Sequence, residues 1–248
     1  MPRLEIIGLT GLPEITAGVA LAPLMVAALD RAGMSLAPTD VMVVTQKIVS
    51  KSEGCEVDLA TIEPSASARA WSAAYDKDPR LLELVLREAI RVVRMDRGVL
   101  ITETRHGLVC ANSGVDVSNA QPGHALTLPP DPDASAARLR AGVAAATGVA
   151  PGVVISDTFG RPWREGLVNV AIGLAGVRAF DDHRGERDVF GRVLHASVLA
   201  IADEVASAAE LVMSKTRQVP VVLVRGLDFG GAGRGRDLLR EPGRDLFR

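Results

Sequence analysis

The sequence predicts a mixed α/β protein of the α+β kind, and neither a Rossmann fold nor a P-loop fold. β-Branched runs and amphipathic stretches follow one another irregularly, so no regular series of parallel βαβ units can be traced. Of the 248 residues, 48% are apolar but only 3% are aromatic. Small apolar side chains in that proportion favour a closely packed core over a disordered chain.

Local periodicity and helix breakers place the individual elements. Strands are predicted at residues 4–7, 41–45, 99–104, 107–111, 153–156, 168–174 and 219–225. Helices are predicted at residues 20–32, 65–76, 79–91, 135–147 and 195–214. The last helix has the clearest apolar stripe, formed by Val198, Ala202, Val205, Ala209 and Val212. Polar or glycine- and proline-rich loops are expected at residues 46–51, 121–132, 157–166 and 181–191.

The length suits a single unit over residues 1–248, with room for two lobes that share a core. Residues 228–248 are rich in Gly, Arg and Asp and predict a flexible tail. The glycines between Gly230 and Gly235 superficially resemble a phosphate-binding loop, but they open no predicted helix.

Charge and cysteine content exclude several classes of protein. The formal net charge is −2, which argues against a nucleic-acid-binding surface. Cys55 and Cys110 form no CxxC pair, so we expect two free thiols rather than a zinc site or a disulfide framework. The first residues lack the apolar core of a signal peptide, and no stretch approaches the roughly 20 apolar residues of a membrane span. We therefore expect a cytoplasmic protein that binds no membrane.

Three polar segments interrupt the apolar strands, and the first of them covers residues 45–54. Hydroxyls, an amide and two lysines, Lys47 and Lys51, follow a buried strand there. Such donors suit phosphate oxygens. A solvated turn after the strand explains the same composition equally well.

The second segment, residues 110–119, holds Asp116 and Asn119 three positions apart. In a helical turn both side chains would point the same way. A carboxylate and an amide oxygen suit a hard cation such as Mg²⁺ or Mn²⁺, with phosphate and water as further ligands. A turn in which these residues only cap backbone groups is the simpler alternative.

The third segment, residues 153–166, favours a functional role over a plain loop. Asp157 and Thr158 end a buried β-branched run, where the strand fixes their side chains. Arg161 and Arg164 add bidentate partners for phosphate or carboxylate groups. His106 lies between two predicted strands and could approach a site. His124, His183 and His195 are expected to be exposed to solvent or to have their hydrogen bonds satisfied within the fold. No nucleophile–base pair and no histidine metal cluster can be traced.

Taken together, these segments resemble the coenzyme F420-0:γ-glutamyl ligase family. Residues 46–54, 104–119 and 156–166 are similar to its three signature blocks, and residues 12–15 and 219–226 also fit. The resemblance runs from about residue 4 to residue 226. It implies an intertwined homodimer of two-lobed mixed α/β protomers, with an inner lobe at roughly residues 95–180.

The family also implies ligands and the residues that bind them. The substrates would be coenzyme F420-0 and L-glutamate, with GTP as co-substrate, two divalent cations (Mg²⁺ or Mn²⁺) and K⁺. Asp116 and Asp157 would bind metal, and Thr158 the second cation. The residues implied to contact GTP are Leu12, Pro13, Glu14, Ile15, Gln46, Lys51, Asn119, Met213, Ser214, Lys215, Thr216, Arg217, Gln218, Val219 and Pro220.

The implied reaction transfers the γ-phosphoryl group of GTP to a substrate carboxylate, and the glutamate amine then displaces phosphate from the acyl phosphate. Catalytic roles are expected for Arg161 or Arg164, as clamps on carboxylates, and for His106, as a base. The residues by themselves fit two other classes equally: a metal-dependent phosphotransferase or phosphatase on the same scaffold, and a nucleotide-binding protein without turnover.

Overall fold

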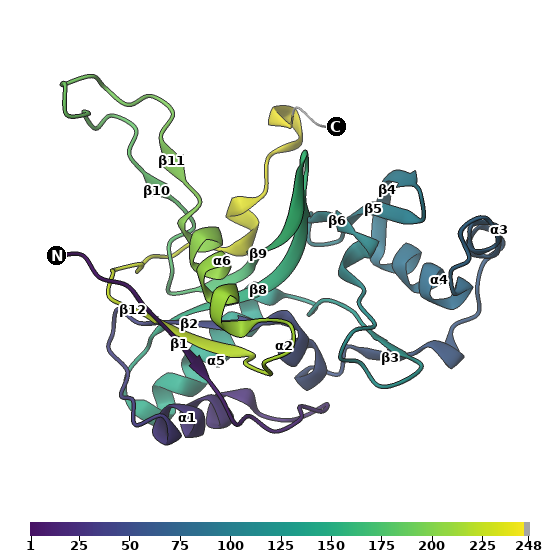
Figure 1. The fold of residues 1–248 in the computed structure, drawn as a ribbon, viewed down its shortest axis with the longest axis horizontal. Helices are drawn as coiled ribbons and strands as arrows, with labels where there is room; N and C mark the ends of the chain where they lie inside the picture. Colours follow the sequence, from purple (N-terminus) through teal and green to yellow (C-terminus); the bar gives the residue numbers. More distant parts are fainter. Residues whose placement is uncertain (246–248) are drawn as a thin grey trace.

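The computed structural model describes residues 1–245 and confirms a mixed α+β architecture that is not a Rossmann fold. A five-stranded sheet lies at its centre (Figure 1). In spatial order its strands are β1 (Glu5–Leu9), β12 (Val221–Arg225), β2 (Val41–Thr45), β8 (Gly152–Arg161) and β9 (Arg164–Ala175). Only β2 and β8 run parallel, and the other neighbouring pairs are antiparallel.

Both faces of this sheet are buried, which explains the continuous apolar run in β2. Met42 and Val44 point to the face covered by α1 (Leu21–Arg31) and α5 (Pro132–Thr147). Val41 and Val43 alternate with them and pack against α6 (Ile201–Met213) on the other face. The two covering layers lie on opposite sides of the sheet in Figure 1. A strand buried on both faces has no polar side to alternate with.

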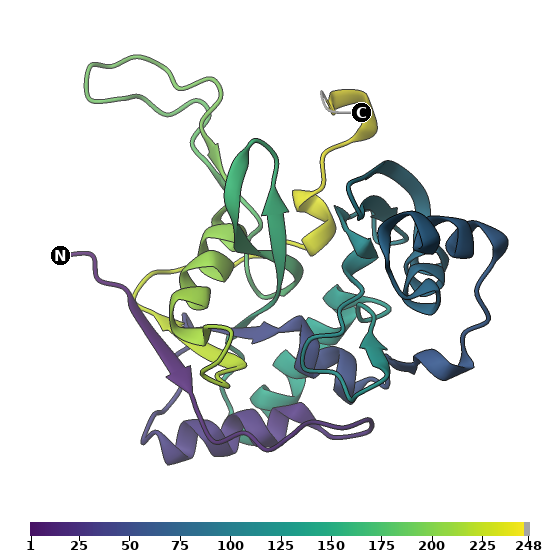
Figure 2. The same ribbon diagram turned by 45° about the vertical axis from the view of Figure 1, so that its right-hand side comes forward.

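A second group of elements lies beside the central sheet (Figure 2). It comprises α3 (Ala66–Tyr75), α4 (Pro79–Glu88), and a three-stranded sheet of β4 (Ala89–Asp96), β5 (Val99–Thr104) and β6 (Val109–Ala111). Its apolar cluster is separate from the two that flank the main sheet. Two further short strands, β3 (Glu56–Asp58) and β7 (His124–Leu126), pair with each other. The division into two lobes, with an inner one at residues 95–180, stays a prediction.

Most predicted elements are present, including the hairpin of β5 and β6, but several boundaries were wrong. The helix expected at 79–91 ends at Glu88, and the next residues form β4. The helix expected at 195–214 begins at Ile201, because residues 198–199 form β11 (Val198–Leu199), which pairs with β10 (Asp181–Asp182). The loop expected at 121–132 contains β7 and the first residue of α5.

Two segments near the functional residues are regular structure rather than loops. Residues 157–166 were expected to be a loop, but they form the hairpin by which β8 turns into β9. The polar segment 46–51 is a helix, α2 (Gln46–Ser52), that follows β2 directly. Its Ile48 and Val49 contribute to the core, and the lysines on either side of them, Lys47 and Lys51, share a face that sequence composition alone did not reveal.

The C-terminal segment packs closely on the body up to residue 239. Phe229 is buried, and Gly230 forms an isolated β-bridge with Val177. A Cβ at Gly235 would lie 2.2 Å from the carbonyl oxygen of Ile172, so this approach requires glycine. The glycines read as part of a flexible tail thus include packing positions. Residues 246–248 of that predicted tail lie outside the described residues.

Two remaining expectations concern the cysteines and membranes. Cys55 and Cys110 are free thiols, as predicted. Burial raises the pKa of Cys110 to about 12. Within residues 1–245, none of the helices combines the length and apolar character that crossing a membrane requires.

A buried ion pair fixes the end of the sheet remote from the polar segments. Asp40 is fully buried just before β2 and accepts hydrogen bonds from Arg225 at 2.9 and 2.6 Å and from the amide of Ala37 at 2.7 Å. Arg225, at the end of β12, also donates to the carbonyl of Ser35. The pair therefore ties β12 to the segment that leads into β2.

We expect Arg225→Met to lower the free energy of unfolding by about 3 kcal/mol, since it leaves a buried carboxylate without its cation. The double variant Asp40→Asn/Arg225→Met should recover part of that loss. Urea unfolding followed by circular dichroism measures both. Equal stability of Arg225→Met and the wild type would show that the pair does not stabilise the sheet.

Candidate active site

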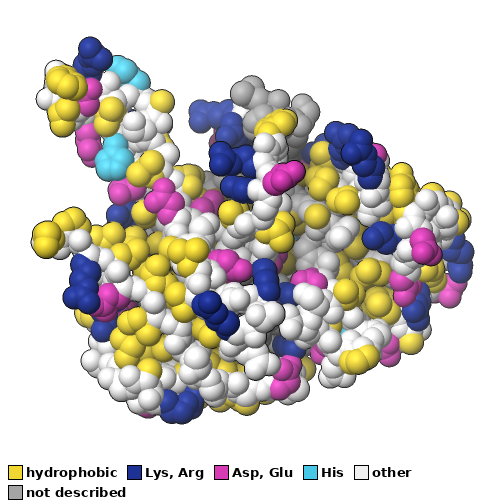
Figure 3. All heavy atoms as spheres, in the orientation of Figure 1, with side chains coloured by type: hydrophobic (Ala, Val, Ile, Leu, Met, Phe, Trp, Pro, Cys, Tyr) yellow, Lys and Arg dark blue, Asp and Glu magenta, His cyan; other side chains and the backbone are white. Residues whose placement is uncertain are grey.

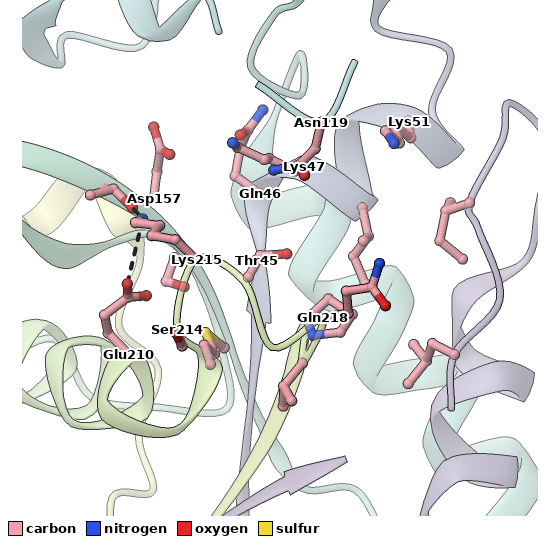
Figure 4. A pocket seen from close by; sticks show the side chains of 18 of the residues that line it. Thr45, Gln46, Lys47, Lys51, Asn119, Asp157, Glu210, Ser214, Lys215 and Gln218 are labelled. Atoms are coloured by element: carbon pink, nitrogen blue, oxygen red, sulfur yellow. Dashed lines mark hydrogen bonds and ion pairs between the residues drawn. The ribbon is translucent and has the colours of Figure 1, made fainter. Parts of the chain in front are cut away.

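A cavity of about 380 Å³ opens at one edge of the central sheet (Figure 4). It is formed by the segment after β1, the end of β2 with α2, the loop before β7, the β8–β9 ladder, and the connection from α6 to β12. The lining residues are Leu12, Pro13, Glu14, Ile15, Thr45, Gln46, Lys47, Ile48, Lys51, Asn119, Ser156, Asp157, Thr158, Asn169, Glu210, Met213, Ser214, Lys215, Gln218, Val219 and Pro220.

Sheet register brings these distant segments together. Leu9, the last residue of β1, pairs with Val221 at the start of β12, and Val221 pairs with Val44 near the end of β2. Thr45, the last residue of β2, pairs with Ser156 in the parallel strand β8. The chain segments that leave or enter the sheet at these positions therefore meet at the same edge.

Two lysines of α2 point to this edge because they lie four residues apart on one helical face. Lys47 Nζ is 2.8 Å from Asp116 Oδ2 and donates to the carbonyl of Ser118 at 3.3 Å. Lys51 forms an ion pair with Glu14. Each ammonium group is thus paired with an acid that comes from a different part of the chain.

Asp116 lies on extended backbone and not on a helical turn, since its amide and carbonyl both bond to Leu126. Its Oδ1 accepts the amide hydrogen of Ser118 at 2.7 Å, and its Oδ2 accepts from the Ser118 hydroxyl and from Lys47. Burial opposes ionisation of Asp116, but the Lys47 and Ser118 contacts outweigh burial and lower its pKa. Asp116 is therefore a carboxylate at neutral pH.

Asp157 is half-buried within β8. Burial raises its pKa from 3.8 to about 6, and the nearby negative charge of Asp116 contributes in the same direction. The amide of Thr158 and the positive charges of Lys47 and Lys215 act in the opposite direction. Among the described residues, no lysine or arginine forms an ion pair with Asp157. This carboxylate would gain most from a cation in the cavity.

A hydrogen-bonded chain extends from β8 across β9 to α6. The Thr158 hydroxyl donates to Asn169 Oδ1 at 2.8 Å, across the directly opposed pair of the β8–β9 ladder. Asn169 Nδ2 donates to Glu210 Oε2 at 2.8 Å. Lys215 Nζ donates to the Thr158 hydroxyl at 2.5 Å and lies 3.4 Å from Glu210 Oε1. Asn169 is only 2% exposed, so its amide is held in one orientation.

Gln46 and Ser50 hold α2 in place. Gln46 Nε2 donates to Ser50 Oγ at 2.6 Å and to the carbonyl of Thr127 at 3.2 Å. Ser50 Oγ donates to the same carbonyl at 2.7 Å. All three residues are buried. The amide nitrogen of Gln46 thus serves the fold, while the residue also lines the cavity wall.

Most residues that the sequence singled out for nucleotide or metal binding line this one cavity. Asp116 is not among them but borders it through Lys47. Thr216 and Arg217, on the loop before β12, are exposed and do not line it.

The three expected catalytic residues lie elsewhere. Arg161 and Arg164 lie at the turn between β8 and β9, where Arg161 bonds to the carbonyls of Glu165 and Gly166. His106 lines a second cavity of about 660 Å³ between the β5–β6 turn, α5 and the C-terminal segment. Its Nε2 donates to the carbonyls of Pro129 and Pro130. Its Nδ1 is buried and has no hydrogen-bond partner among the described residues. Burial lowers the pKa of His106.

Sequence reasoning named Lys47 beside Lys51 as a phosphate donor but missed Asn169 and Glu210 as site residues. A helix over residues 46–52 would have placed Lys47 on the face of Lys51, but the segment was read as a polar turn. Asn169 was detectable as the single amide within an apolar strand. Nothing in the sequence marked Glu210 apart from the other acids of α6.

Comparison with known proteins adds an independent observation. The model of the F420-0:Gamma-glutamyl ligase family matches residues 10–226. Relatives named coenzyme F420:L-glutamate ligase include those of Methanopyrus kandleri, 47% identical over 84% of this chain and 85% of theirs, and Methanothermobacter thermautotrophicus, 43% identical over 99% of both chains. The relative of Archaeoglobus fulgidus is 37% identical over 99% of this chain and 97% of its own.

The chain belongs to the F420-0:γ-glutamyl ligase family. The match covers every segment that lines the cavity.

The family resemblance implies divalent cations, and the donors present can be tested against that requirement. Among the described residues, no group of three or more His, Cys, Asp or Glu side chains converges on one point. Mg²⁺ and Mn²⁺ bound with nucleotides often take only one or two carboxylates and complete their shell with phosphate and water. Asp157, half-buried and without an ion-pair partner among the described residues, and the neighbouring Asp116 fit one such ion. Thr158 fits a second ion poorly, because its hydroxyl already contacts Asn169 and Lys215.

Without metal or nucleotide, Asp157→Asn should be more stable than the wild type at pH 7 by on the order of 1–2 kcal/mol. The pKa of Asp157 is raised on folding, so its contribution to stability is present below pH 3.8 and is lost as the pH rises through about 6. The neutral amide does not titrate. The gain should therefore shrink between pH 6 and pH 4.

Urea unfolding in EDTA across this pH range measures the difference. A stability difference independent of pH, or a destabilised variant at pH 7, would contradict the raised pKa.

Proposed function

We propose that this protein is a coenzyme F420-0:L-glutamate ligase that uses GTP to form an amide bond between the deazaflavin and glutamate. The observation that supports this most is the cavity that Lys47, Lys51 and Lys215 line together with Asp157, with Asp116 at its border. Phosphoryl transfer requires mainly positioning and neutralisation of charge, which such a set of groups provides. The names of the relatives supply the substrates of the proposal.

The proposed reaction has two steps. The γ-phosphoryl group of GTP moves to a carboxylate oxygen of F420-0, and GDP leaves. The amine of L-glutamate then attacks the acyl carbon, phosphate leaves with the bond electrons, and the amine proton passes to a base. Further glutamates would be added by the same steps, γ-linked after the first.

The residues of the cavity have distinct parts in this scheme. Lys47 and Lys51 bind phosphate oxygens, and their present acidic partners, Asp116 and Glu14, orient them beforehand. A divalent cation held by Asp116 and Asp157 would neutralise charge on the phosphates. The segments 12–15 and 213–220, which form opposite parts of the lining, enclose the nucleotide and exclude water.

The remaining expectations stay predictions. These are K⁺, the roles of Arg161 and Arg164 at the β8–β9 turn, and His106 as a base from the second cavity. The γ-phosphoryl acceptor must be long enough to extend from the nucleotide toward those groups if they bind its carboxylates.

Phosphate release should require GTP, Mn²⁺, F420-0 and L-glutamate together, and mass spectrometry should find the deazaflavin heavier by glutamyl units. Asp157→Asn should reduce the rate at least 100-fold, since charge-stabilising groups of phosphoryl transfer contribute on that order. Asp96→Asn, at the end of β4 with a side chain that is 45% exposed, is the matched control and should retain full activity.

Phosphate release in the absence of L-glutamate would instead favour a phosphatase or phosphotransferase. GTP binding without any release would favour a nucleotide-binding protein without turnover.

A homodimer is part of the same proposal, supported by an exposed apolar arm. Residues 181–199 project from the body, and Val189 and Phe190 at the arm's end are 94% and 84% exposed. Figure 3 shows hydrophobic side chains at the far end of the arm. Apolar groups held so far from the core are typical of a contact with another chain.

Light scattering after gel filtration should give the mass of a dimer for the wild type. Phe190→Asp should shift the mass toward the monomer because it places a charge in the contact, whereas Phe190→Leu should remain dimeric. A monomeric wild type, or a dimer unaffected by Phe190→Asp, would contradict this role of the arm.

A further inference from the structure

Lys215 occupies the place where a second divalent cation is implied. Its side chain leaves the loop that follows α6 and points back to β8, as Figure 4 shows beside Asp157 and Glu210. Its Nζ donates to the Thr158 hydroxyl at 2.5 Å and lies 3.4 Å from Glu210 Oε1. An ammonium group therefore already contacts the oxygen that was expected to bind the ion.

The Thr158 hydroxyl has few hydrogen-bonding positions, so its contact with Lys215 limits what else can bind to it. Thr158 has one donor, which it uses toward Asn169 Oδ1, and it accepts from Lys215. Asn169 is buried and bonds in turn to Glu210, so the Thr158 proton is held in the direction of the amide. A metal ion at this oxygen would have to use the one remaining lone pair, and it would then lie close to the positive charge of the Lys215 ammonium.

The chemistry of lysine suits the phosphates of a nucleotide. The ammonium is a compact charge on a flexible stem, and it binds phosphate as a point charge. Its side chain is 58% exposed and lines the cavity, so its ammonium can contact a phosphate in the cavity while it stays beside Thr158. Glu210, 26% exposed, keeps the ammonium at this wall before the nucleotide arrives.

The backbone around Lys215 also holds it at the cavity. Met213 is buried and ends α6, and the flanking Ser214 and Gln218 adopt φ values of +55°. Positive φ is uncommon for residues other than glycine and persists where the surroundings hold it. The segment is thus a defined turn that presents Lys215 and not a random connection.

We propose that Lys215 supplies, as a tethered ammonium, the positive charge that a second divalent cation would bring to the nucleotide. The chain would then bind its nucleoside triphosphate with one divalent cation, on Asp116 and Asp157. This inference rests on the proposed use of GTP. It assigns Lys215 as a phosphate-binding residue and Glu210 as the residue that positions it, with Asn169 acting through Glu210.

The test counts metal ions and measures affinity, without turnover. Wild-type protein saturated with guanosine 5′-(β,γ-imido)triphosphate is titrated with Mn²⁺, and the free ion is followed by electron paramagnetic resonance. We expect one tightly bound Mn²⁺ per chain. In Lys215→Gln the analogue should bind roughly tenfold more weakly, since a charged hydrogen bond is lost, whereas Lys215→Arg should stay near the wild type.

Lys77→Gln, between α3 and α4, removes a lysine far from the cavity and should change neither the ion count nor the affinity. Circular dichroism checks that each variant folds. Two bound Mn²⁺ per wild-type chain, or an unchanged affinity in Lys215→Gln, would overturn the inference and leave the proposed function standing. Failure of the wild type to bind the analogue at all would instead overturn the proposed function, and the inference with it.

Discussion

The parallel pairing of β2 with β8 is the constraint on which the rest of the site depends. Parallel strands end at the same edge of a sheet, so the residues that follow β2 and those that end the buried part of β8 must meet. Two antiparallel strands bring further segments to the same edge. β12 starts there and β1 ends there. Four segments from the two ends and the middle of the chain are thereby fixed beside one another.

Burial on both faces of the sheet gives this edge its electrostatic character. Asp157 lies where β8 leaves the apolar interior, so its negative charge is poorly solvated and its pKa is raised to about 6. The lysines of α2 lie opposite, and they are held by acids rather than by the core. Such a site suits an anion and a cation bound together. The anion would offset the charge of the lysines, and the cation would offset the charge of Asp157.

The sequence predicted most strands and the candidate residues, but not the way in which they combine. β2 was predicted at its observed bounds because every residue from Val41 to Val44 is apolar. The helix α2 was missed because five of its seven residues are polar and only the adjacent Ile48 and Val49 are apolar. The loop expected after Ser156 is a hairpin, since pairing across the strands outweighs the turn signals of Gly160 and Pro162.

Site residues on β9 and α6 could not be predicted for a different reason. Asn169 and Glu210 gain their roles only through contacts across the β8–β9 ladder and between sheet and helix. Neither contact leaves a local pattern, because the partners are 11 and 41 residues apart in the chain. The same holds for the glycines after Phe229, which read as a flexible segment although close packing requires Gly235. Register and tertiary contact, rather than propensity, determine these positions.

Hydrogen–deuterium exchange with and without guanosine 5′-(β,γ-imido)triphosphate and Mn²⁺ tests most directly whether this sheet edge is the nucleotide site. We expect the analogue and Mn²⁺ to slow amide exchange in residues 12–15, 45–52 and 214–220, which surround the cavity. Slower exchange confined to residues 105–108 and 233–239, around the second cavity, would contradict it.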